Sequence, residues 1–262
     1  MRFVRCGDMM RELTVIPPGV QLFTLRNELE QDFFGTLEKV ADMGYKLVEP
    51  FSWGYEQIPA EQLKAELRRL GLRAISTFVY PLTPDTLESH LAYAETIGAH
   101  YIVTSLTEES YAEEQALQAS IAMLRKLGLA IRRRGMQLLY HPHGEEFDIR
   151  NGCRTIDRLL AGVGTDVMKL ALDTYWLKKA GIDPRSALLS YKGLSPLIHV
   201  KDIDQDGQFT EIGRGTLDWT SLFGSFGEAG VRYYFVEQDE SPHPLQSIQA
   251  SLDYLKSRLA AD

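Results

Sequence analysis

Cysteine is scarce in this chain: only Cys6 and Cys153 occur among 262 residues, and they lie far apart in the sequence. A thiolate metal site needs closely spaced cysteines, so that class of site is excluded. A low cysteine count also favours a reducing compartment, and the cytoplasm is the simplest expectation.

Long apolar runs near the N-terminus and an excess of positive charge are also lacking. Residues 1–18 are interrupted by charges such as Arg5 and Asp8, so we expect a peripheral lead-in rather than a signal peptide or a membrane span. The chain has 28 Lys and Arg residues against 36 Asp and Glu, a formal net charge of −8. Nucleic acid and anionic membranes are bound chiefly through basic residues, so neither is expected as a partner.

What the chain has instead is a regular alternation of short apolar strands and longer amphipathic helices. The expected strands cover residues 19–23, 46–49, 72–78, 100–104, 136–140, 168–173, 196–201 and 232–237. The helices that follow them cover about residues 32–43, 60–70, 85–97, 111–134, 153–162, 184–190, 219–229 and 244–259. A polar hairpin is expected over residues 202–215, around an Asp-Gly turn.

Eight such units predict an α/β fold, a single (β/α)8 TIM barrel over residues 19–262. Uninterrupted alternation of strand and helix is typical of a parallel sheet that helices cover. A doubly wound open sheet is the alternative. It is disfavoured because the turn after the first strand, Thr24 to Glu28, lacks the glycines of a phosphate-binding loop.

Histidine and carboxylate side chains follow the later strands, at the end of a barrel where chemistry takes place. His141 and His143 come after the fifth strand, and alternate residues of an extended segment share a face, so both imidazoles should point the same way. Asp173, His199 and Glu237 end the next three strands. A helix cap for Asp173 and a backbone-bonded core histidine for His199 are the ordinary alternatives.

Together with His141 or Glu146, these three residues would form a set of four ligands rich in oxygen. Such a set suits Mn²⁺, Mg²⁺, Co²⁺ or Zn²⁺.

Several segments, taken in order, resemble a known family. They are Gly19 to Arg26, Tyr140-His141-Pro142-His143 with Glu146-Phe147, Leu172 to Trp176 with Ala180 to Pro184, His199 to Asp202, Gly213-Arg214-Gly215 before Asp218-Trp219, and Val236 to Asp239. From residue 19 to its end, the chain is similar to the xylose-isomerase-like TIM barrels of the sugar phosphate isomerase/epimerase superfamily. That superfamily also contains D-tagatose 3-epimerases, inosose dehydratases and endonuclease IV.

The resemblance implies one divalent ion, with Mn²⁺ as the first candidate. Its ligands would be Glu146, Asp173, His199 and Glu237. Epimerases of the superfamily end the fifth strand with Glu, whereas this chain has His141 there. The Tyr-His-Pro-His pattern looks more like that of inosose dehydratases and enzymes acting on keto-sugars, in which His143 would be free for acid/base work.

The chemistry that the resemblance implies is removal of a proton next to a carbonyl group, with the ion stabilising the enediolate. Glu237 or His143 would be the base, and His141 or Lys201 would return or relay a proton. The expected activity is that of a divalent-metal-dependent sugar isomerase or epimerase. The alternatives are a dehydratase or other lyase acting on a keto-inositol or 3-keto-sugar, and a non-catalytic sugar-binding barrel. The net charge and the six histidines speak against a DNA-repair endonuclease.

Four further side chains are weaker candidates for binding a small-molecule sugar or keto-sugar. Glu49, Trp53 and Trp176 would line a sugar pocket, although an aromatic residue after a strand more often belongs to the core. Arg214, between two glycines, would bind a phosphate or hydroxyl group, or simply form a turn. The resemblance also allows a homo-oligomer, without indicating its interface.

Overall fold

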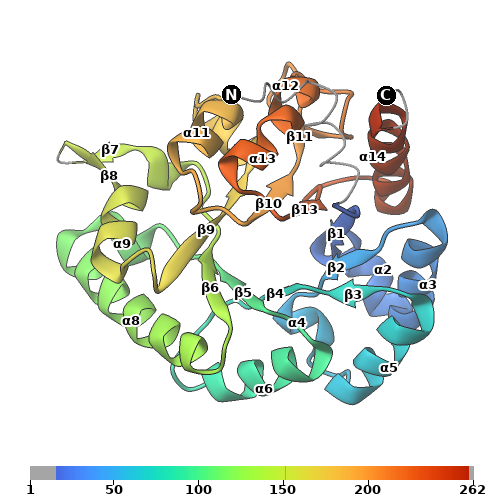
Figure 1. The fold of residues 1–262 in the computed structure, drawn as a ribbon, viewed down its shortest axis with the longest axis horizontal. Coiled ribbons are helices and arrows are strands. Elements are labelled where there is room, and N and C mark those ends of the chain that lie inside the picture. The colour runs from blue at the N-terminus through green and yellow to red at the C-terminus, as the bar shows by residue number, and fades with distance from the viewer. Residues whose placement is uncertain (1–15, 151, 260–262) are drawn as a thin grey trace, which may run out of the picture.

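The computed structural model describes residues 16–150 and 152–259, so most of the lead-in expected over residues 1–18 lies outside the described residues. Parallel strands form a ring at the centre of the molecule, and helices cover its outside (Figure 1). The predicted TIM barrel is therefore confirmed. Its strands are β1 (Gly19–Gln21), β2 (Leu47–Glu49), β3 (Arg73–Ala74), β4 (Ser76–Phe78), β5 (Tyr101–Thr104), β6 (Gln137–Tyr140), β9 (Met168–Asp173), β10 (Leu197–Val200) and β13 (Tyr233–Val236).

The third strand of the barrel is broken into β3 and β4, which pair with different neighbours. The order of strands runs β3-β2-β1-β13-β10-β9-β6-β5-β4. At the break, the carbonyl of Ile75 accepts hydrogen bonds from the backbone of His100 and Tyr101 on the β5 side. A parallel bridge between Phe51 and Phe78 then joins β4 to the chain that follows β2. Two short segments thus occupy one strand position, and the ring closes.

All the expected helices are present, although the helix over 111–134 and that over 219–229 are each divided in two. Helices α5 and α6 end at Gly71 and Gly98, whose φ angles of 67° and 84° are readily adopted only by glycine. The helices are α2 (Arg26–Gln31), α3 (Phe33–Met43), α4 (Ser52–Tyr55), α5 (Ala60–Leu70), α6 (Leu87–Ile97), α7 (Glu109–Ala112), α8 (Glu114–Arg133), α9 (Thr155–Val163), α10 (Thr174–Lys179), α11 (Pro184–Ser190), α12 (Trp219–Gly224), α13 (Phe226–Ala229) and α14 (Pro244–Leu259), with the 3-10 turns η1 (Leu22–Leu25) and η2 (Glu145–Phe147).

The core has two parts, as expected for helices packed around a barrel. The larger part lies between the strands and the surrounding helices. The smaller part fills the inside of the barrel, with one side chain from each of seven strand positions. These side chains are Leu47, Ile75, Val103, Leu139, Ala171, Leu197 and Phe235. This apolar layer blocks the barrel, so the space above it is a site rather than a pore.

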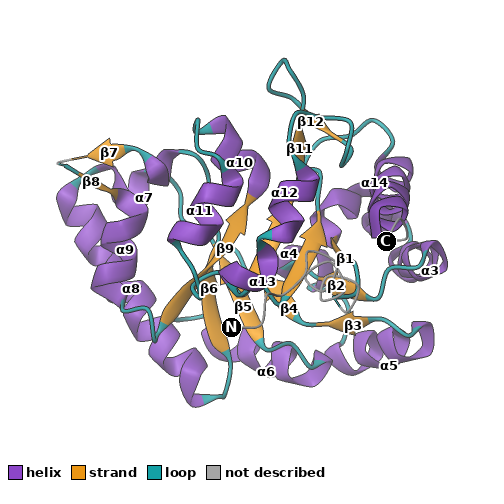
Figure 2. Cartoon of the chain, turned by 45° about the horizontal axis from the view of Figure 1, so that its top comes forward, coloured by secondary structure: helices purple, strands orange, loops and turns teal. Residues whose placement is uncertain are grey.

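The predicted hairpin after β10 is confirmed: β11 (Asp202–Ile203) pairs antiparallel with β12 (Phe209–Thr210) and projects above the barrel (Figure 2). A second hairpin, β7 (Ile149–Arg150) with β8 (Cys153–Arg154), was not predicted. Among the described residues, the helices are too short or too polar to cross a membrane.

Candidate active site

A ring of polar side chains lies directly above the apolar layer. Alternate residues of a strand face the same side, so the residue two positions after each apolar residue also points inward. Leu139, Ala171, Leu197 and Phe235 are followed in this way by side chains able to bind metal or move protons. These side chains, all buried, are His141, Asp173, His199 and Glu237.

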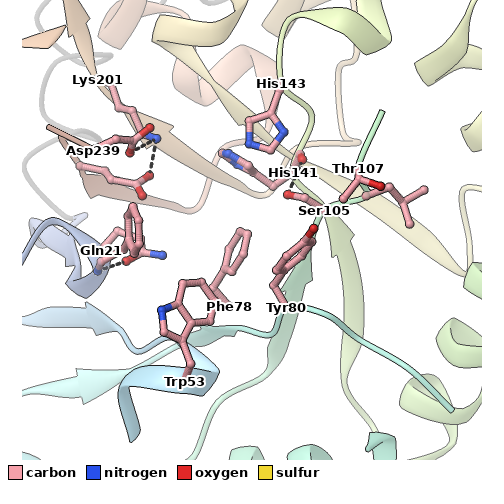
Figure 3. Close-up of a pocket in the computed structure, with 13 residues that line it drawn as sticks. Gln21, Trp53, Phe78, Tyr80, Ser105, Thr107, His141, His143, Lys201 and Asp239 are labelled. Carbon is pink, nitrogen blue, oxygen red and sulfur yellow. Dashed lines mark hydrogen bonds and ion pairs between the residues drawn. The ribbon is translucent and has the colours of Figure 1, made fainter. Parts of the chain in front are cut away.

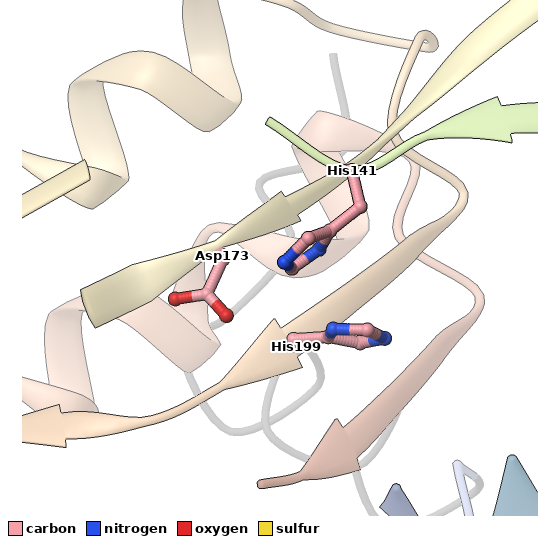
Figure 4. Close-up of side chains that lie close together, drawn as sticks. All are labelled: His141, Asp173 and His199. Atoms are coloured by element: carbon pink, nitrogen blue, oxygen red, sulfur yellow. The ribbon is translucent and has the colours of Figure 1, made fainter. Parts of the chain in front are cut away.

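Three of these side chains converge closely enough to share one ion (Figure 4). One ligand atom from each of His141, Asp173 and His199 lies within 4.8 Å of the others. His141 Nδ1, Asp173 Oδ2, His199 Nδ1 and Glu237 Oε2 are buried, and among the described residues none of them has a hydrogen-bond partner. His199 Nδ1 and Glu237 Oε2 are 3.0 Å apart, but the pair is not aligned for a hydrogen bond. His141 Nδ1 is thus a buried acceptor without a partner, which is costly, and a cation would satisfy it. The two carboxylate oxygens have no hydrogen bond but form ion pairs with Lys201, so a cation would give them a second positive partner.

The two carboxylate oxygens of Asp173 make different contacts. Oδ1 caps helix α10 by accepting hydrogen bonds from the backbone of Tyr175, at 2.8 Å, and of Trp176, at 3.0 Å. Oδ2 accepts no hydrogen bond and lies 3.3 Å from Lys201 Nζ. Figure 4 shows the carboxylate beside the rings of His141 and His199. Asp173 can therefore be both a helix cap and a metal ligand, because the cap uses only Oδ1 and fixes the carboxylate in place.

Glu49 fixes the orientation of the His199 ring from below. The Nε2–H of His199 donates to Glu49 Oε1 at 2.8 Å, and the hydroxyl of Ser76 donates to the other oxygen of the same carboxylate. A proton held on Nε2 leaves the lone pair of Nδ1 free to bind a metal. Glu49 was expected to line a sugar pocket, but its side chain is fully buried beneath His199 and does not line the cavity.

Lys201 lies among three carboxylates at the edge of the same cluster. Its Nζ is 2.6 Å from Asp239 Oδ1, 3.0 Å from Glu237 Oε2 and 3.3 Å from Asp173 Oδ2. With Glu49, four carboxylates surround a single buried ammonium group and the imidazole of His199. This excess of negative charge also favours a bound cation.

Burial and the neighbouring charges shift the pKa values of the three histidines in different directions. Burial, helped by the positive charge of Lys201, lowers the pKa of His143 to about 4. Burial likewise holds the pKa of His141 well below its ordinary value, so both rings are neutral at pH 7. For His199, burial would lower the pKa, but the carboxylates of Glu49 and Glu237 outweigh it and raise the pKa to about 10. His199 must therefore lose a proton before it can bind a metal.

The pKa values of the carboxyl groups of Glu237 and Asp239 are also shifted in opposite directions. Burial acts to raise the pKa of Glu237, but Lys201 and His199 outweigh it and lower that pKa to about 2. Burial raises the pKa of Asp239 to about 6, against the opposing effect of Lys201. Glu237 is thus ionised throughout the physiological range, whereas Asp239 has an ionisation equilibrium near neutral pH.

Glu146 lies outside the converging group. Its carboxylate accepts a hydrogen bond from the Tyr140 hydroxyl at 2.6 Å and another from the backbone N–H of His143 at 3.0 Å. The structure therefore does not bring Glu146 together with Asp173 and His199, as the predicted ligand set requires. It brings His141 to that place instead, because His141 is the inward-facing residue at the end of β6.

Above these converging side chains is a cavity of about 260 Å³, shown in Figure 3. Its polar side is formed by His141, His143, Lys201, Glu237 and Asp239. Its opposite side is mostly aromatic and includes Phe23, Trp53, Phe78 and Tyr80. The volume lies just below the about 300–1,000 Å³ usual for ligand pockets, which suits a single small ring.

Two other predicted binding residues lie away from the cavity lining. Trp176 packs edge-on against the His143 ring, with 5.1 Å between the centroids, and so supports that histidine from behind. Arg214 is exposed, and its nearest ionic partner is Glu211 at 3.4 Å. Phe78 and Tyr80 line the cavity but were not predicted to do so. They belong to no motif, and the one available signal was their position, with Phe78 at the end of β4 and Tyr80 two residues later.

Residues 37–258 match the protein family described as "Xylose isomerase-like TIM barrel". Among relatives, the inosose dehydratase of Clostridium beijerinckii is 23% identical over 274 aligned positions, which cover 87% of this chain and 90% of the relative. The inosose dehydratase of Geobacillus kaustophilus is also 23% identical, over 84% of this chain and 85% of the relative. These names describe enzymes that act on inosose.

Solved structures share the fold. A sugar phosphate isomerase/epimerase from Parabacteroides distasonis has a TM-score of 0.79 and 20% identity, covering 92% of this chain and 98% of that protein. The IOLI protein, solved with a zinc atom bound, has a TM-score of 0.70 and 14% identity, covering 94% and 98%. The fold, the site at the strand ends and the family match over most of the sequence agree, and this chain belongs to the xylose isomerase-like TIM barrel family.

Proposed function

We propose that this chain is a metal-dependent enzyme that removes a proton next to the carbonyl group of a keto-sugar or cyclic keto-polyol, and that loss of water follows. The observation that carries the proposal is the convergence of His141, Asp173 and His199, with Glu237 beside them, below a cavity that His143 also lines. Two nitrogens and two oxygens suit a divalent ion such as Mn²⁺, Mg²⁺, Co²⁺ or Zn²⁺.

We assign the ion to His141, Asp173, His199 and Glu237. This set keeps three of the four ligands expected from the sequence and replaces Glu146 by His141, since Glu146 is engaged by Tyr140 and by the backbone of His143. When bound, a divalent ion polarises a carbonyl oxygen and acidifies the neighbouring C–H group. The zinc atom in the related IOLI structure supports an ion of this charge.

His143 is assigned as the general base. With a pKa of about 4, its imidazole is neutral at pH 7 and can accept a proton. Edge contacts to Trp176 and His141 hold the ring, and Glu146 holds its backbone N–H. A positioned base typically contributes a factor of about 10²–10⁴ to the rate when its pKa lies near the operating pH, and the low pKa of His143 places its contribution at the low end of this range.

Lys201 is assigned as the general acid. Burial acts against its charge, but Asp173, Asp239 and Glu237 outweigh this effect and raise its pKa well above the ordinary value. As the electron pair of the C–H bond forms a C=C double bond, the adjacent C–O bond breaks. The hydroxyl group leaves with a proton from Lys201 as water, and the proton on His143 returns to Lys201 through solvent. One neutral base and one charged acid match this elimination.

Isomerisation or epimerisation, the activity expected first from the sequence, is the second candidate. Two groups that exchange protons, His143 and Lys201, both line the cavity, so one could remove the proton and the other return it. The family relatives named as isomerases and epimerases are consistent with it. Elimination is preferred because the relatives that align over most of this chain are named inosose dehydratases.

The test is an assay of metal-loaded protein on a keto-inositol, with mass spectrometry for loss of water and chromatography for stereoisomers. A dehydrated product that disappears in His143→Asn supports the proposal. A product of unchanged mass that is a stereoisomer of the substrate would support isomerisation or epimerisation instead. Binding without any turnover, under each of the four metals, would leave a non-catalytic sugar-binding barrel.

A further inference from the structure

Trp53 separates two hollows on the same face of the barrel. It is one of few large apolar side chains that are exposed among the described residues, with 43% of its surface accessible. On one side it lines the cavity that contains His143 and Lys201 (Figure 3). On the other side it lines a groove of about 530 Å³ bounded by α2, α3 and α4. The two hollows therefore meet at one indole ring.

The groove has an aromatic floor. Phe33, Phe51 and Trp53 contribute to it, and the Phe51 and Trp53 rings pack edge to face with 4.8 Å between their centroids. The cavity wall nearest the groove is aromatic as well, since Phe23 and Phe78 contact Trp53 at centroid distances of 5.8 Å and 6.4 Å. A group that extends from the cavity towards the groove thus passes along aromatic surfaces, which favour flat rings.

The rim of the groove is polar but has no excess of charge. One cation, one anion and two amides line it: Arg26, Glu30, Asn27 and Gln57. One nitrogen of the Arg26 guanidinium is engaged, because its Nη1 donates to the carbonyl oxygens of Asp239 at 2.8 Å and of Phe23 at 3.2 Å, and the charge of Arg26 is offset by that of Glu30 on the same rim. Such a rim does not favour a phosphate or carboxylate ligand, which would need unopposed positive charge. It suits an uncharged group with polar edges.

We propose that the cavity and the groove are two subsites of one binding site. The reacting ring occupies the cavity, and an uncharged aryl substituent of the substrate occupies the groove beyond Trp53. The proposal rests on the proposed function for the identity of the first subsite. It extends that function by naming a substrate larger than a free sugar, with a phenolic group attached to the polar ring.

The experiment compares unreactive probes that share one sugar: methyl β-glucoside, 4-nitrophenyl β-glucoside and methyl β-cellobioside, titrated by calorimetry into metal-loaded protein. We expect the aryl glucoside to bind about tenfold or more tightly than the methyl glucoside. The variants Gln57→Trp and Asn27→Trp should obstruct the groove and abolish this gain, while binding of methyl glucoside is unchanged. Glu56→Trp, an exposed neighbour that does not line the groove, is the matched control and should keep the gain.

Equal affinities for the methyl and aryl glucosides, no binding of either, or a gain that survives both groove variants would overturn the second subsite. A gain for the cellobioside without one for the aryl glucoside would overturn the aryl assignment and make the groove a sugar subsite. These readouts need no turnover, so failure of the proposed elimination is recognised separately, by the water-loss assay. If a groove variant loses the gain for the aryl glucoside and still dehydrates keto-inositol at the wild-type rate, the substitution acts on the groove and not on the cavity.

Discussion

The choice between His141 and Glu146 as a metal ligand depends on the hydrogen bonds of each side chain. Glu146 is satisfied by Tyr140 and by the backbone of His143, whereas His141 Nδ1 has no partner among the described residues. We expect His141→Ala to lose the ion and Glu146→Gln to retain it. Elemental analysis of proteins purified without chelator measures this, with Asp173→Ala as the positive control and the exposed Glu145→Gln as the negative control. An empty site in Glu146→Gln and a full one in His141→Ala would reverse the assignment.

We expect Glu49 to affect the affinity of the site for the metal and not its affinity for the sugar. Its carboxylate holds the Nε2–H of His199, which keeps Nδ1 free as a ligand, and it does not line the cavity. We expect Glu49→Gln to weaken metal binding by about 10–100-fold, the usual effect of losing a partner of a ligand histidine. Competition with a fluorescent chelator gives the affinity.

At saturating metal, the KM of the Glu49→Gln variant for the sugar should equal that of wild type. A raised KM with unchanged metal affinity would instead restore the substrate-binding role that its position at a strand end suggested. Ser76→Ala, which removes the other hydrogen bond to the same carboxylate, is expected to have the smaller effect on metal binding.

Several residues show why a sequence predicts a site only in part. The inward positions of His141, Asp173, His199 and Glu237 were predictable because each lies at or beside the end of a strand, two positions after an apolar residue, and that spacing is visible in the sequence. The oxygen atom that each carboxylate offers could not be found. Asp173 caps a helix with one oxygen and faces the site with the other, and only the three-dimensional arrangement separates these uses.

At the scale of elements, the segment after β10 depends on one buried carboxylate. Asp202 accepts hydrogen bonds from the backbone of Ile203, Gly213, Gly215 and Leu217, and from the indole N–H of Trp219 at 2.7 Å. A Cβ at residue 215 would lie 2.2 Å from an Asp202 oxygen, so this glycine is required by close approach. The two glycines that flank Arg214 therefore allow their backbone N–H groups to reach the Asp202 carboxylate. They do not indicate a binding role for Arg214.

We expect Asp202→Ala to lower the free energy of unfolding by about 3 kcal/mol or more, because several donors would lose their partner in a buried place. Urea denaturation followed by circular dichroism gives the value. Asp206→Ala, in the exposed turn of the same hairpin, is the control and should change the stability by less than about 0.5 kcal/mol. A similar cost for both variants would mean that the hairpin, and not the Asp202 network, determines the stability of this segment.

The strand and helix boundaries were predictable where local signals were strong. β9, α5, α11 and α14 agree with the expected ranges because each begins or ends at a proline, a glycine or a change of pattern. The break between β3 and β4 was not predictable, since it results from the pairing of Ile75 with residues of the neighbouring strand. α10 was not predicted as a helix, although a helix cap was an alternative for Asp173, because this residue both ends β9 and caps α10.

At the scale of the whole molecule, the barrel brings opposite charges into a dry interior, and this makes the stability of the metal-free protein depend on pH. Glu49 and Glu237 raise the pKa of His199 to about 10, from an ordinary value of 6.5. Between these two pH values the folded chain holds a proton on His199 that the unfolded chain has lost. The stabilisation is therefore complete below pH 6.5 and is lost as the pH rises through about 10.

We expect the free energy of unfolding of chelator-treated protein to fall between pH 7 and pH 9 by about 1.4 kcal/mol per pH unit, the value for one proton. Urea denaturation at several pH values measures the slope. In His199→Asn the slope should vanish, because no imidazole remains to be protonated. Metal-loaded protein should also show a flat profile, since an ion on Nδ1 displaces the proton and keeps the carboxylates paired. If the slope persists in His199→Asn and in the metal-loaded protein, a group other than His199 titrates in this pH range. The His199 imidazole would then not be protonated in the folded metal-free protein.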